Sequence, residues 1–443
     1  MNRVYRRLLK TLSIYIWLIG LGISCFGQVG SLKPMSVSLS DLLMKAGANN
    51  LVLDEWEKKY EVALAKQIKE KEWYLPTFYA GVKGHQLFGS AMNGDGRFFT
   101  NVNRNNYWVG AGANAEWDFG KGKTAYNAAG KRAEGIRFQS QGEKNQILLK
   151  LVHAYLDLQA AQLEYETLEI LYRQTDTIIR QIELQVEAGL RYKSELLLAK
   201  SNAKHTEFMM KRSRVTMGEA SATLGELLNM KEAYLLVCSE KAFIPVELVD
   251  KELVLKRSFE PIAKRPELLG MRMNIEALQE ERLQYTKGLK LPRLNVGLYD
   301  GVFGDPFSSG FNTFEVNVGL IWDLPLGSLL NAYKGDVKRV DSEIAWMHNQ
   351  IEQFSNTARH DVIGASTRIE LAVEQIEVAK EGLELAGTAW YQSRERQKLG
   401  TVKPFEVFQA QEYYIQAQLD YIEAVKAYNK AQYDLFVAQG NQL

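Results

Sequence analysis

The sequence contains one short motif with the residue types of a phosphate-binding loop. Gly122-Lys123-Thr124 follows a predicted strand and begins a predicted helix, which is where a P-loop lies. A P-loop also requires a glycine five positions earlier, because its backbone must wrap around the phosphate, and that position is Trp117. The motif therefore does not predict phosphate binding.

Metal-ligating and nucleophilic side chains are few and widely spaced. Two histidines three or four positions apart would share a helix face and could bind one metal ion, but no such pair occurs. The five histidines are His85, His153, His205, His348 and His360. The acidic residues follow the polar faces of predicted helices, and none pairs with a candidate nucleophile. The sequence predicts no metal site, no cofactor and no enzyme active site.

The charge balance excludes one class of partner. The chain has 54 Lys and Arg against 53 Asp and Glu, which gives a formal net charge of +1. A nucleic-acid-binding protein needs a basic excess to neutralise phosphates. We therefore expect no nucleic-acid partner.

Residues 1–27 have the composition of a secretory signal peptide. Arg3, Arg6 and Lys10 precede an apolar run that extends to Phe26, and we expect cleavage before Gln28. The chain is then exported from the cytoplasm.

The alternative is a lipoprotein that is cleaved before Cys25 and acylated there, although Leu21 lies one position too early for a lipobox. After cleavage before Gln28 only Cys238 remains, so no intramolecular disulfide is possible. No later apolar run is long enough for a transmembrane helix.

Three short motifs occur twice, in the same order and at a nearly constant distance. The pairs are Leu75-Pro76 and Leu291-Pro292, 216 residues apart; Trp117-Asp118 and Trp322-Asp323, 205 apart; and Gly189 and Gly400, 211 apart. This pattern indicates an internal duplication of about 210 residues. We expect a first repeat at 28–230, an irregular segment at 231–264 and a second repeat at 265–443.

Each repeat contains a predicted β-hairpin, at about 76–119 and about 292–324. The strands Asn106–Phe119 and Phe311–Leu324 alternate apolar and polar side chains, and each strand is about ten residues long. This alternation, with aromatic residues near the strand ends, is typical of transmembrane β-strands, but a soluble sheet with one wet face would also show it. The polar segments expected to connect the strands are Gly89–Asn105 and Gly304–Gly310.

Four strands are too few to close a barrel, since the smallest barrels need about eight. An open sheet edge in lipid would leave backbone groups without hydrogen bonds. If the strands are transmembrane, several chains must combine them, and three chains would supply twelve.

The polar faces of these strands would line a water-filled space. The acidic residues on them are Glu116, Asp118, Glu315 and Asp323, and the basic residues are Lys83 and Arg293. An acidic ring would favour cations by Coulomb attraction, mildly in a wide pore. Ordinary solvated side chains are the alternative interpretation.

Most of each repeat is predicted to be helical. Two runs without proline, Lys121–Glu187 and Asn331–Gln397, keep a helical apolar pattern for about 67 residues, or about 100 Å. Helices this long need neighbours along their length. Their polar residues suit a wall around a water-filled space or an exposed coiled coil. Shorter helices are predicted at Leu39–Trp73, Ser194–Asn229, Pro266–Lys287 and Pro404–Gln439.

Several motifs in this order resemble one family. They are Ser38-Leu39-Ser40-Asp41-Leu42, Leu75-Pro76, Ala188-Gly189-Leu190, Arg265-Pro266-Glu267-Leu268, Leu291-Pro292 and Leu399-Gly400-Thr401. Their spacing and duplication resemble the TolC family of outer-membrane efflux proteins over essentially the whole mature chain. The resemblance implies a homotrimer, with a twelve-stranded barrel in the outer membrane and a helical barrel through the periplasm. It implies a passive conduit that docks on an inner-membrane pump through a periplasmic adaptor.

The turns at Gly189 and Gly400 would form the periplasmic tip, because glycine permits the left-handed backbone that reverses the chain. By the same resemblance, the residues expected to dock the adaptor are Gly189, Leu190, Gly400 and Thr401. We hypothesise that nearby charges set a gate through ionic pairs: Arg191, Lys193, Glu195, Lys403 and Glu406. The alternative is that both glycines are only turn residues.

The predicted fold class is mainly α with a small β part. It combines a very long antiparallel coiled coil with four transmembrane strands per chain, duplicated internally and closed as a trimer. Two alternatives remain at this point. A periplasmic adaptor would lack the two hairpins, and a structural coiled-coil protein of the cell envelope would not need alternating strands.

Overall fold

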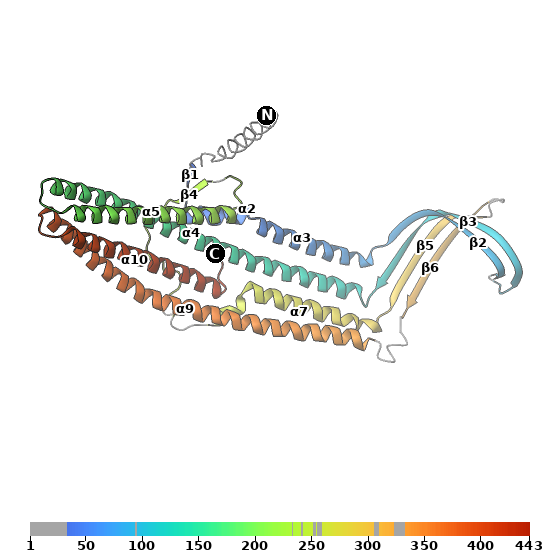
Figure 1. Ribbon diagram of the computed structural model, residues 1–443. Helices are drawn as coiled ribbons and strands as arrows, with labels where there is room; N and C mark the ends of the chain where they lie inside the picture. The colour runs from blue at the N-terminus through green and yellow to red at the C-terminus, as the bar shows by residue number, and fades with distance from the viewer. Residues whose placement is uncertain are drawn as a thin grey trace, which may run out of the picture.

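The computed structural model is an elongated rod with a sheet at one end and helix turns at the other (Figure 1). It describes residues 33–443 except 94, 233, 241, 251–253, 255–258, 305–309 and 323–332. The predicted signal peptide, Cys25 and Asp323 lie outside the described residues. Among the described residues, no helix combines the length and the apolarity that crossing a membrane requires.

Two very long helices run along most of the rod. α4 (Gly122–Glu187) has 66 residues and α9 (Lys334–Lys398) has 65. Each is about 100 Å long at about 1.5 Å per residue. Both predicted runs are confirmed, with ends within three residues of those expected. The shorter helices are α2 (Leu39–Asn49), α3 (Leu51–Lys71), α5 (Lys193–Leu227), α7 (Pro266–Gln284) and α10 (Pro404–Ala438).

The prediction of one helix at Leu39–Trp73 is wrong, because Asn50 divides it. The Asn50 backbone is extended, and its side-chain oxygen accepts the amide of Val52 at 2.9 Å and that of Leu53 at 3.4 Å. This is an N-cap, which starts a new helix. The Asn50 amide group also donates to the Leu227 carbonyl at 2.9 Å. Asn50 therefore ends α2, begins α3 and fastens both to the end of α5.

The helices lie side by side as one curved layer. In the half with the turns, α5 contacts α4, α4 contacts α10, and α10 contacts α9. Near the sheet the order is α3, α4, α7 and α9. α9 is therefore one edge of the layer along its whole length, and α3 and α5 form the other edge. A small parallel sheet, β1 (Lys33–Val37) with β4 (Tyr234–Cys238), packs on α4 and α5 at mid-length.

The four long strands form one antiparallel sheet in the order β2-β3-β5-β6. They are β2 (Thr77–Met92), β3 (Phe98–Asp118), β5 (Arg293–Gly304) and β6 (Phe311–Ile321). Both predicted hairpins are present, but β2 and β3 have 16 and 21 residues, more than expected. The segment Gly89–Asn105, predicted as a connection, is mostly strand, because backbone pairing does not require apolar side chains. β5 pairs with β3 only from Tyr107 onward, so the first hairpin extends beyond the second.

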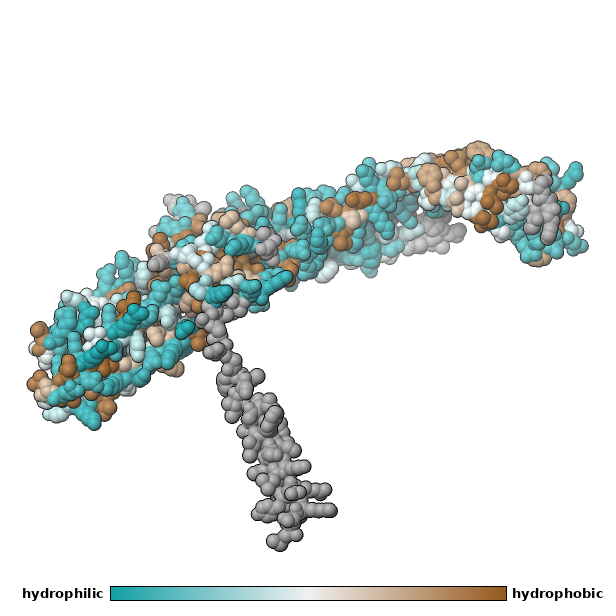
Figure 2. All heavy atoms as spheres, turned by 90° about the horizontal axis from the view of Figure 1, so that it is seen from above, coloured by the Kyte–Doolittle hydropathy of each residue, from teal (hydrophilic) through white to brown (hydrophobic). Residues whose placement is uncertain are grey.

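The strand register gathers the predicted apolar residues on one face of the sheet. Two rows of cross-strand neighbours are Val82–Val109–Val302 and Phe78–Ala113–Leu298–Val316. Phe78 is 78 % exposed and Val318 is 69 % exposed, so this face is uncovered in a single chain. Figure 2 shows apolar surface over the strands and at the opposite, helix-turn end. Polar residues also occur on this face; one of them, Asp300, lies between Ala111 and Phe314.

Candidate functional site

The two helix turns at the end of the rod have the same backbone geometry. Gly189 has a φ of 74° and Gly400 a φ of 71°. In the first turn the amide of Leu190 bonds to the carbonyl of Gln185 at 2.8 Å, and the second turn has the equivalent bond at 3.1 Å. This is a Schellman helix ending, which requires the left-handed backbone that glycine adopts freely. Added side chains would meet no atom within 4 Å, so the requirement is conformational rather than steric.

Arg191 connects the first turn to the second. Its Nη2 donates to the Val402 carbonyl at 2.7 Å and to Oε1 of Gln397 at 3.3 Å. Its Nε donates to Oε1 of Gln185 at 2.7 Å, and its Nη1 lies 3.4 Å from the Glu195 carboxylate. The Arg191 side chain is only 10 % exposed. Its hydrogen bonds therefore hold the two turns together in a partly desolvated setting, where charged hydrogen bonds are strong.

The other predicted gate charges are placed differently. Lys193, Lys403 and Glu406 are exposed, and they form no ion pair with residues that the structure describes. Among the five charges, the structure brings together Arg191 and Glu195. Nothing in the sequence distinguishes Arg191 from the other four charges, because its bond to the Val402 carbonyl in the second turn exists only in the folded chain.

The surface of the tip is apolar as well as charged. Leu190, Tyr192 and Leu399 are each more than three quarters exposed. Thr401 is also exposed, and its hydroxyl donates to the Arg396 carbonyl at 3.1 Å. Beneath them lies a buried cluster shared by both hairpins: Ile178, Ile179, Ile182, Ala199, Trp390, Val402, Val407 and Phe408. The tip, which comprises the turns at Gly189 and Gly400 with the adjoining helix ends, therefore has a packed apolar core. It also exposes apolar side chains, and exposed apolar patches mark interaction sites.

The polar face of the sheet holds the residues predicted to face water. Glu116 accepts a hydrogen bond from Nη1 of Arg293 at 2.7 Å, so this acid is neutralised. Asp118 has a structural role, since its Oδ1 accepts the amides of Gly120 and Lys121 where β3 turns into α4. Glu315 is exposed on the same face. Only part of the predicted acidic set is therefore available to attract cations.

Aromatic rings on this polar face lie against glycines, which the sequence analysis did not anticipate. A methyl group on Gly112 would lie 2.8 Å from the Tyr79 ring, and one on Gly301 would lie 2.9 Å from Nε1 of Trp108. Tyr79 belongs to β2 and Gly112 to β3; Trp108 belongs to β3 and Gly301 to β5. Each ring therefore covers the backbone of a neighbouring strand. The alternation of glycine with aromatic residues was the available signal.

Catalytic and metal-binding arrangements are not found in the part of the chain that the structure describes. No group of three His, Cys, Asp or Glu side chains there could hold a metal ion. Burial raises the pKa of the Cys238 thiol to about 12, so it stays protonated and unreactive. Nε2 of His153 lies 3.0 Å from Oδ1 of Asp434, and Asp434 also pairs with Arg368, so these polar contacts join α4, α9 and α10.

Comparison with known proteins matches the second repeat to one family and the whole chain to one fold. Residues 260–441 match the family model described as outer membrane efflux protein. A membrane protein from Pseudomonas aeruginosa has the same fold, with a TM-score of 0.75 and 16 % identity over 91 % of this chain and 92 % of that chain. The outer membrane protein VceC from Vibrio cholerae gives a TM-score of 0.71 and 14 % identity, over 91 % and 96 %. The MtrE outer membrane channel of Neisseria gonorrhoeae gives 0.71 and 15 %, over 91 % and 89 %.

The sequence matches no curated protein. The family match covers the second repeat, and the first repeat shares its hairpin, its long helix and its glycine turn. Residues 260–441 therefore match the outer membrane efflux protein family, and the chain as a whole shares the fold of the outer-membrane channels, so the predicted resemblance is confirmed at the level of the second repeat and of the fold.

Proposed function

We propose that this protein is the outer-membrane exit channel of a tripartite efflux or type I secretion system. The observation that carries this proposal is the open four-stranded sheet with one apolar and one polar face. Its outer strands, β2 and β6, pair on one side only within the described residues. An unpaired edge in lipid leaves backbone groups unsatisfied, so other copies must complete the sheet. The adaptor and structural coiled-coil alternatives do not call for such a sheet.

A homotrimer satisfies this requirement. Three four-stranded sheets give a twelve-stranded barrel, an even number of strands as bacterial barrels have. The apolar face then meets lipid, and the polar face with Glu116 and Glu315 lines the lumen. The helical layers continue this barrel as a tube through the periplasm, which α4 and α9 are long enough to form. The protein supplies a passive path, and its polar lumen imposes at most a mild preference for cations.

The tip is the proposed docking surface for a periplasmic adaptor, which links the channel to an inner-membrane pump. Exposed Leu190 and Leu399 flank Gly189 and Gly400 and offer apolar contacts beside solvated charges. The two turns present nearly the same surface, because their backbones share one geometry. In a trimer the adaptor would meet six similar turns.

Arg191 is the proposed element of the resting gate. Its hydrogen bonds to Val402 and Gln397 hold the two turns of one chain together, and the Glu195 carboxylate orients the Arg191 side chain. Opening of the channel would move the Gly189 turn away from the Gly400 turn and break the hydrogen bonds of Arg191. The Glu195→Lys substitution removes the orienting charge, and we expect it to increase channel opening. Unchanged opening and efflux in this variant would count against the gate.

The proposed function is tested by membrane fractionation and gel migration of the full-length protein. We expect it in the outer membrane as a trimer that dissociates on heating, and we expect it to form conducting channels in planar bilayers. A purely soluble monomer would overturn the proposal. Loss of drug efflux or protein secretion on deletion would place the protein in such a system.

A further inference from the structure

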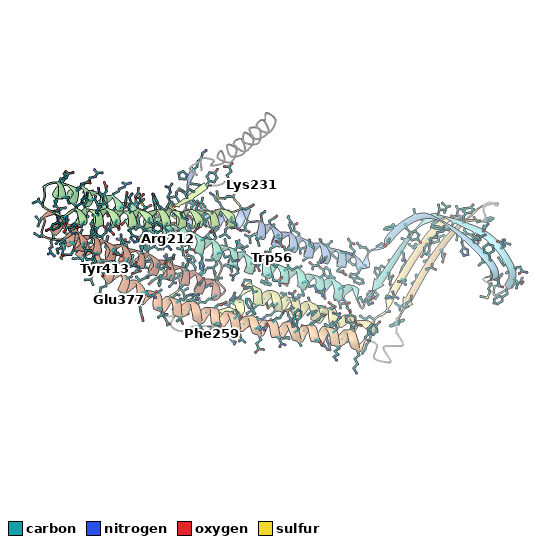
Figure 3. The ribbon with its side chains drawn as sticks, in the orientation of Figure 1. Trp56, Arg212, Lys231, Phe259, Glu377 and Tyr413 are labelled. Atoms are coloured by element: carbon teal, nitrogen blue, oxygen red, sulfur yellow. The ribbon has the colours of Figure 1, made fainter. Side chains whose placement is uncertain are left out.

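The sheet carries aromatic side chains on the face that does not meet lipid in the proposed barrel. The aromatic girdles of transmembrane barrels lie on the lipid-facing side, near the two membrane surfaces. Figure 3 shows the side chains that project from the strands at this end of the rod. Five aromatic residues on the polar face form what we call the pore-face aromatic cluster: Tyr79, Trp108, Tyr299, Phe303 and Phe311. Anchoring in lipid therefore does not explain these rings.

The strand register places the cluster in two cross-strand rows. The first row is Tyr79–Gly112–Tyr299–Glu315, and the second is Lys83–Trp108–Phe303–Phe311. The second row lies four residues farther from the helices, which is about 13 Å along a strand. The row between them contains three glycines, Gly81, Gly110 and Gly301. The rings therefore stand beside a part of the sheet that has almost no side chains of its own.

Three of the rings lie against backbone. Tyr79 on β2 and Tyr299 on β5 are separated by β3, yet their ring centroids are 5.9 Å apart. They can approach each other because Gly112, which lies between them on β3, has no side chain. Trp108 covers Gly301, where an added methyl group would lie 2.9 Å from Nε1 of the indole. The three side chains are half-buried, so each still offers part of its ring to the lumen.

Two phenylalanines extend the second row and remain uncovered. Phe303 is 45 % exposed and Phe311 is 71 % exposed. Water surrounds this face in the proposed barrel, and contiguous apolar surface in contact with water marks binding sites. Packing on glycine accounts for the positions of Tyr79 and Trp108, but it does not account for these two phenylalanines.

A positive charge lies at the cluster. Nζ of Lys83 is 5.6 Å from the centroid of the Trp108 ring and 5.8 Å from that of Tyr79, which is within cation–π distance. Lys83 is exposed and forms no ion pair with residues that the structure describes. Arg104 lies on the same face, four positions from Trp108 on β3, and it likewise has no ion-pair partner among the described residues. The cluster therefore combines ring surface with positive charge.

The acids of the polar face lie closer to the helices. Glu315 is four positions from Phe311 on β6, or about 13 Å, which exceeds the Debye length of about 8 Å at physiological salt. Glu116 is farther away and is paired with Arg293. The mild preference for cations therefore belongs to the helix-side part of the barrel, whereas the row of Lys83 attracts anions.

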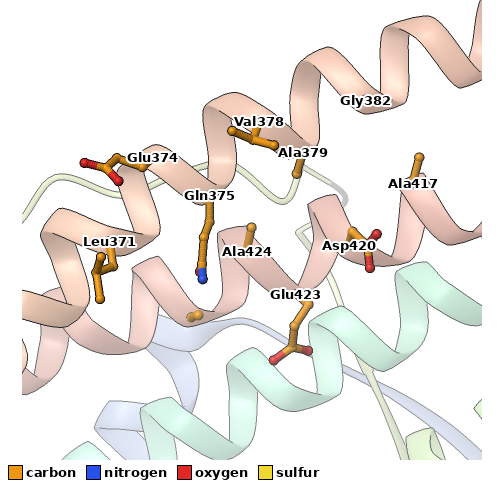
Figure 4. Close-up of a pocket in the computed structure, with 11 residues that line it drawn as sticks. Leu371, Glu374, Gln375, Val378, Ala379, Gly382, Ala417, Asp420, Glu423 and Ala424 are labelled. Carbon is orange, nitrogen blue, oxygen red and sulfur yellow. The ribbon is translucent and has the colours of Figure 1, made fainter.

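A cavity in the helical part has the opposite chemistry. It lies between α9 and α10 and has a volume of about 860 Å³. Figure 4 shows aliphatic Leu371 and Val378 around it together with acidic Glu374 and Glu423. No aromatic side chain among the described residues lines this cavity. Of these two places, the sheet alone offers ring surface beside positive charge.

We propose that the pore-face aromatic cluster and Lys83 bind planar anionic aromatic molecules, the class of aromatic carboxylates and sulfonates, as they pass through the barrel. The ligand ring stacks on Trp108 and Phe303, and its anionic group pairs with the Lys83 ammonium. The site rests on the proposed function, since it requires that the polar face line a lumen, and it names a class of cargo. Three copies place the site three times around the barrel.

Binding of naphthoate to the purified trimer tests the proposal. Naphthoate is fluorescent, and its fluorescence anisotropy should rise when it binds to a particle as large as the trimer. Unlabelled naphthalenesulfonate should displace it. Cyclohexanecarboxylate keeps the negative charge without a planar ring, and naphthylmethylammonium keeps the ring with the opposite charge, so we expect neither to displace naphthoate. Displacement by either compound as effective as that by naphthalenesulfonate would contradict the proposed ligand class.

Two substitutions test the residues of the site. Lys83→Gln removes the charge and nearly keeps the side-chain length, and Trp108→Leu removes the indole ring. Each should weaken naphthoate binding about three- to tenfold. Lys45→Gln is the matched control, because Lys45 is exposed on α2, away from the sheet, and its substitution removes the same charge. Equal affinity in the parent and in Lys83→Gln would overturn the site, also where Trp108→Leu fails to assemble.

The outcomes for the site and for the proposed function are distinguishable. A heat-modifiable trimer that does not bind naphthoate would refute the site and leave the proposed function standing. A parent protein that forms no trimer would refute both.

Discussion

Arg191 donates from Nη2 to the backbone carbonyl of Val402 at 2.7 Å, and these residues are 211 positions apart. The same distance separates Gly189 from Gly400. Arg191 therefore bonds to its own counterpart in the second repeat. Duplication supplied two similar turns, and one arginine joins them where the second repeat has a buried valine.

Replacing Arg191 with Ala should loosen the tip and raise channel conductance in planar bilayers. The variant loses bonds to a carbonyl, two amide side chains and a carboxylate, and hydrogen bonds to charged groups contribute about 1.5–3 kcal/mol each. Lys193→Ala is the matched control, since Lys193 is exposed and forms no ion pair with described residues. Equal conductance in both variants would show that Arg191 does not restrain the tip.

Gly112→Ala should impair assembly of the strand region. The new methyl group would lie 2.7 Å from the Leu298 carbonyl and 2.8 Å from the Tyr79 ring. Overpacking of this kind costs typically about 1–3 kcal/mol. The measurement is the yield of heat-modifiable trimer in the outer membrane.

Gly81→Ala is the control for this substitution. Gly81 pairs with Gly110 and lies on the same face, but a methyl group there would meet no atom within 4 Å. We expect a normal yield from Gly81→Ala. A reduced trimer yield from both variants would mean that any methyl group at these glycines impairs assembly, independently of contact with the Tyr79 ring.

Much of the fold follows from local signals in the sequence. The helix ends at Gly189, Gly400 and Pro404 were placed well because glycine and proline fix the backbone themselves. The break at Asn50 was missed because a single capping residue does not interrupt the apolar period on either side. The length of β3 was missed because its Asn-rich part resembles a loop, although its backbone pairs with β2.

The side-chain contacts of the candidate site could not be predicted from local sequence signals. The bond from Arg191 to Val402 joins residues that are close only after both hairpins fold and pack through Trp390 and Ile182. The structural role of Asp118 likewise depends on the turn geometry that follows β3. Alternation showed correctly which face Glu116 and Glu315 occupy, but it carried no information on which acids are already paired.

Cys238 should resist alkylation in the folded protein. Its pKa is raised to about 12, chiefly by burial, so almost no thiolate exists at neutral pH. Maleimide labelling should be absent in native protein and complete after denaturation. Rapid labelling of native protein would show that the packing of β4 on α4 and α5 opens readily.

Glu164→Gln should stabilise the helical region at neutral pH. Desolvation by burial raises the pKa of Glu164; Lys426 opposes this shift and Glu423 adds to it. A raised pKa means that ionisation disfavours the folded state, and this penalty is fully present above the folded-state pKa. It disappears as the pH falls below the ordinary carboxyl value of 4.5, where the group is protonated in both states. Thermal unfolding should therefore show a higher midpoint for the variant at pH 7 and equal midpoints near pH 4. A stabilisation that does not change with pH would mean that packing, rather than charge burial, causes the effect.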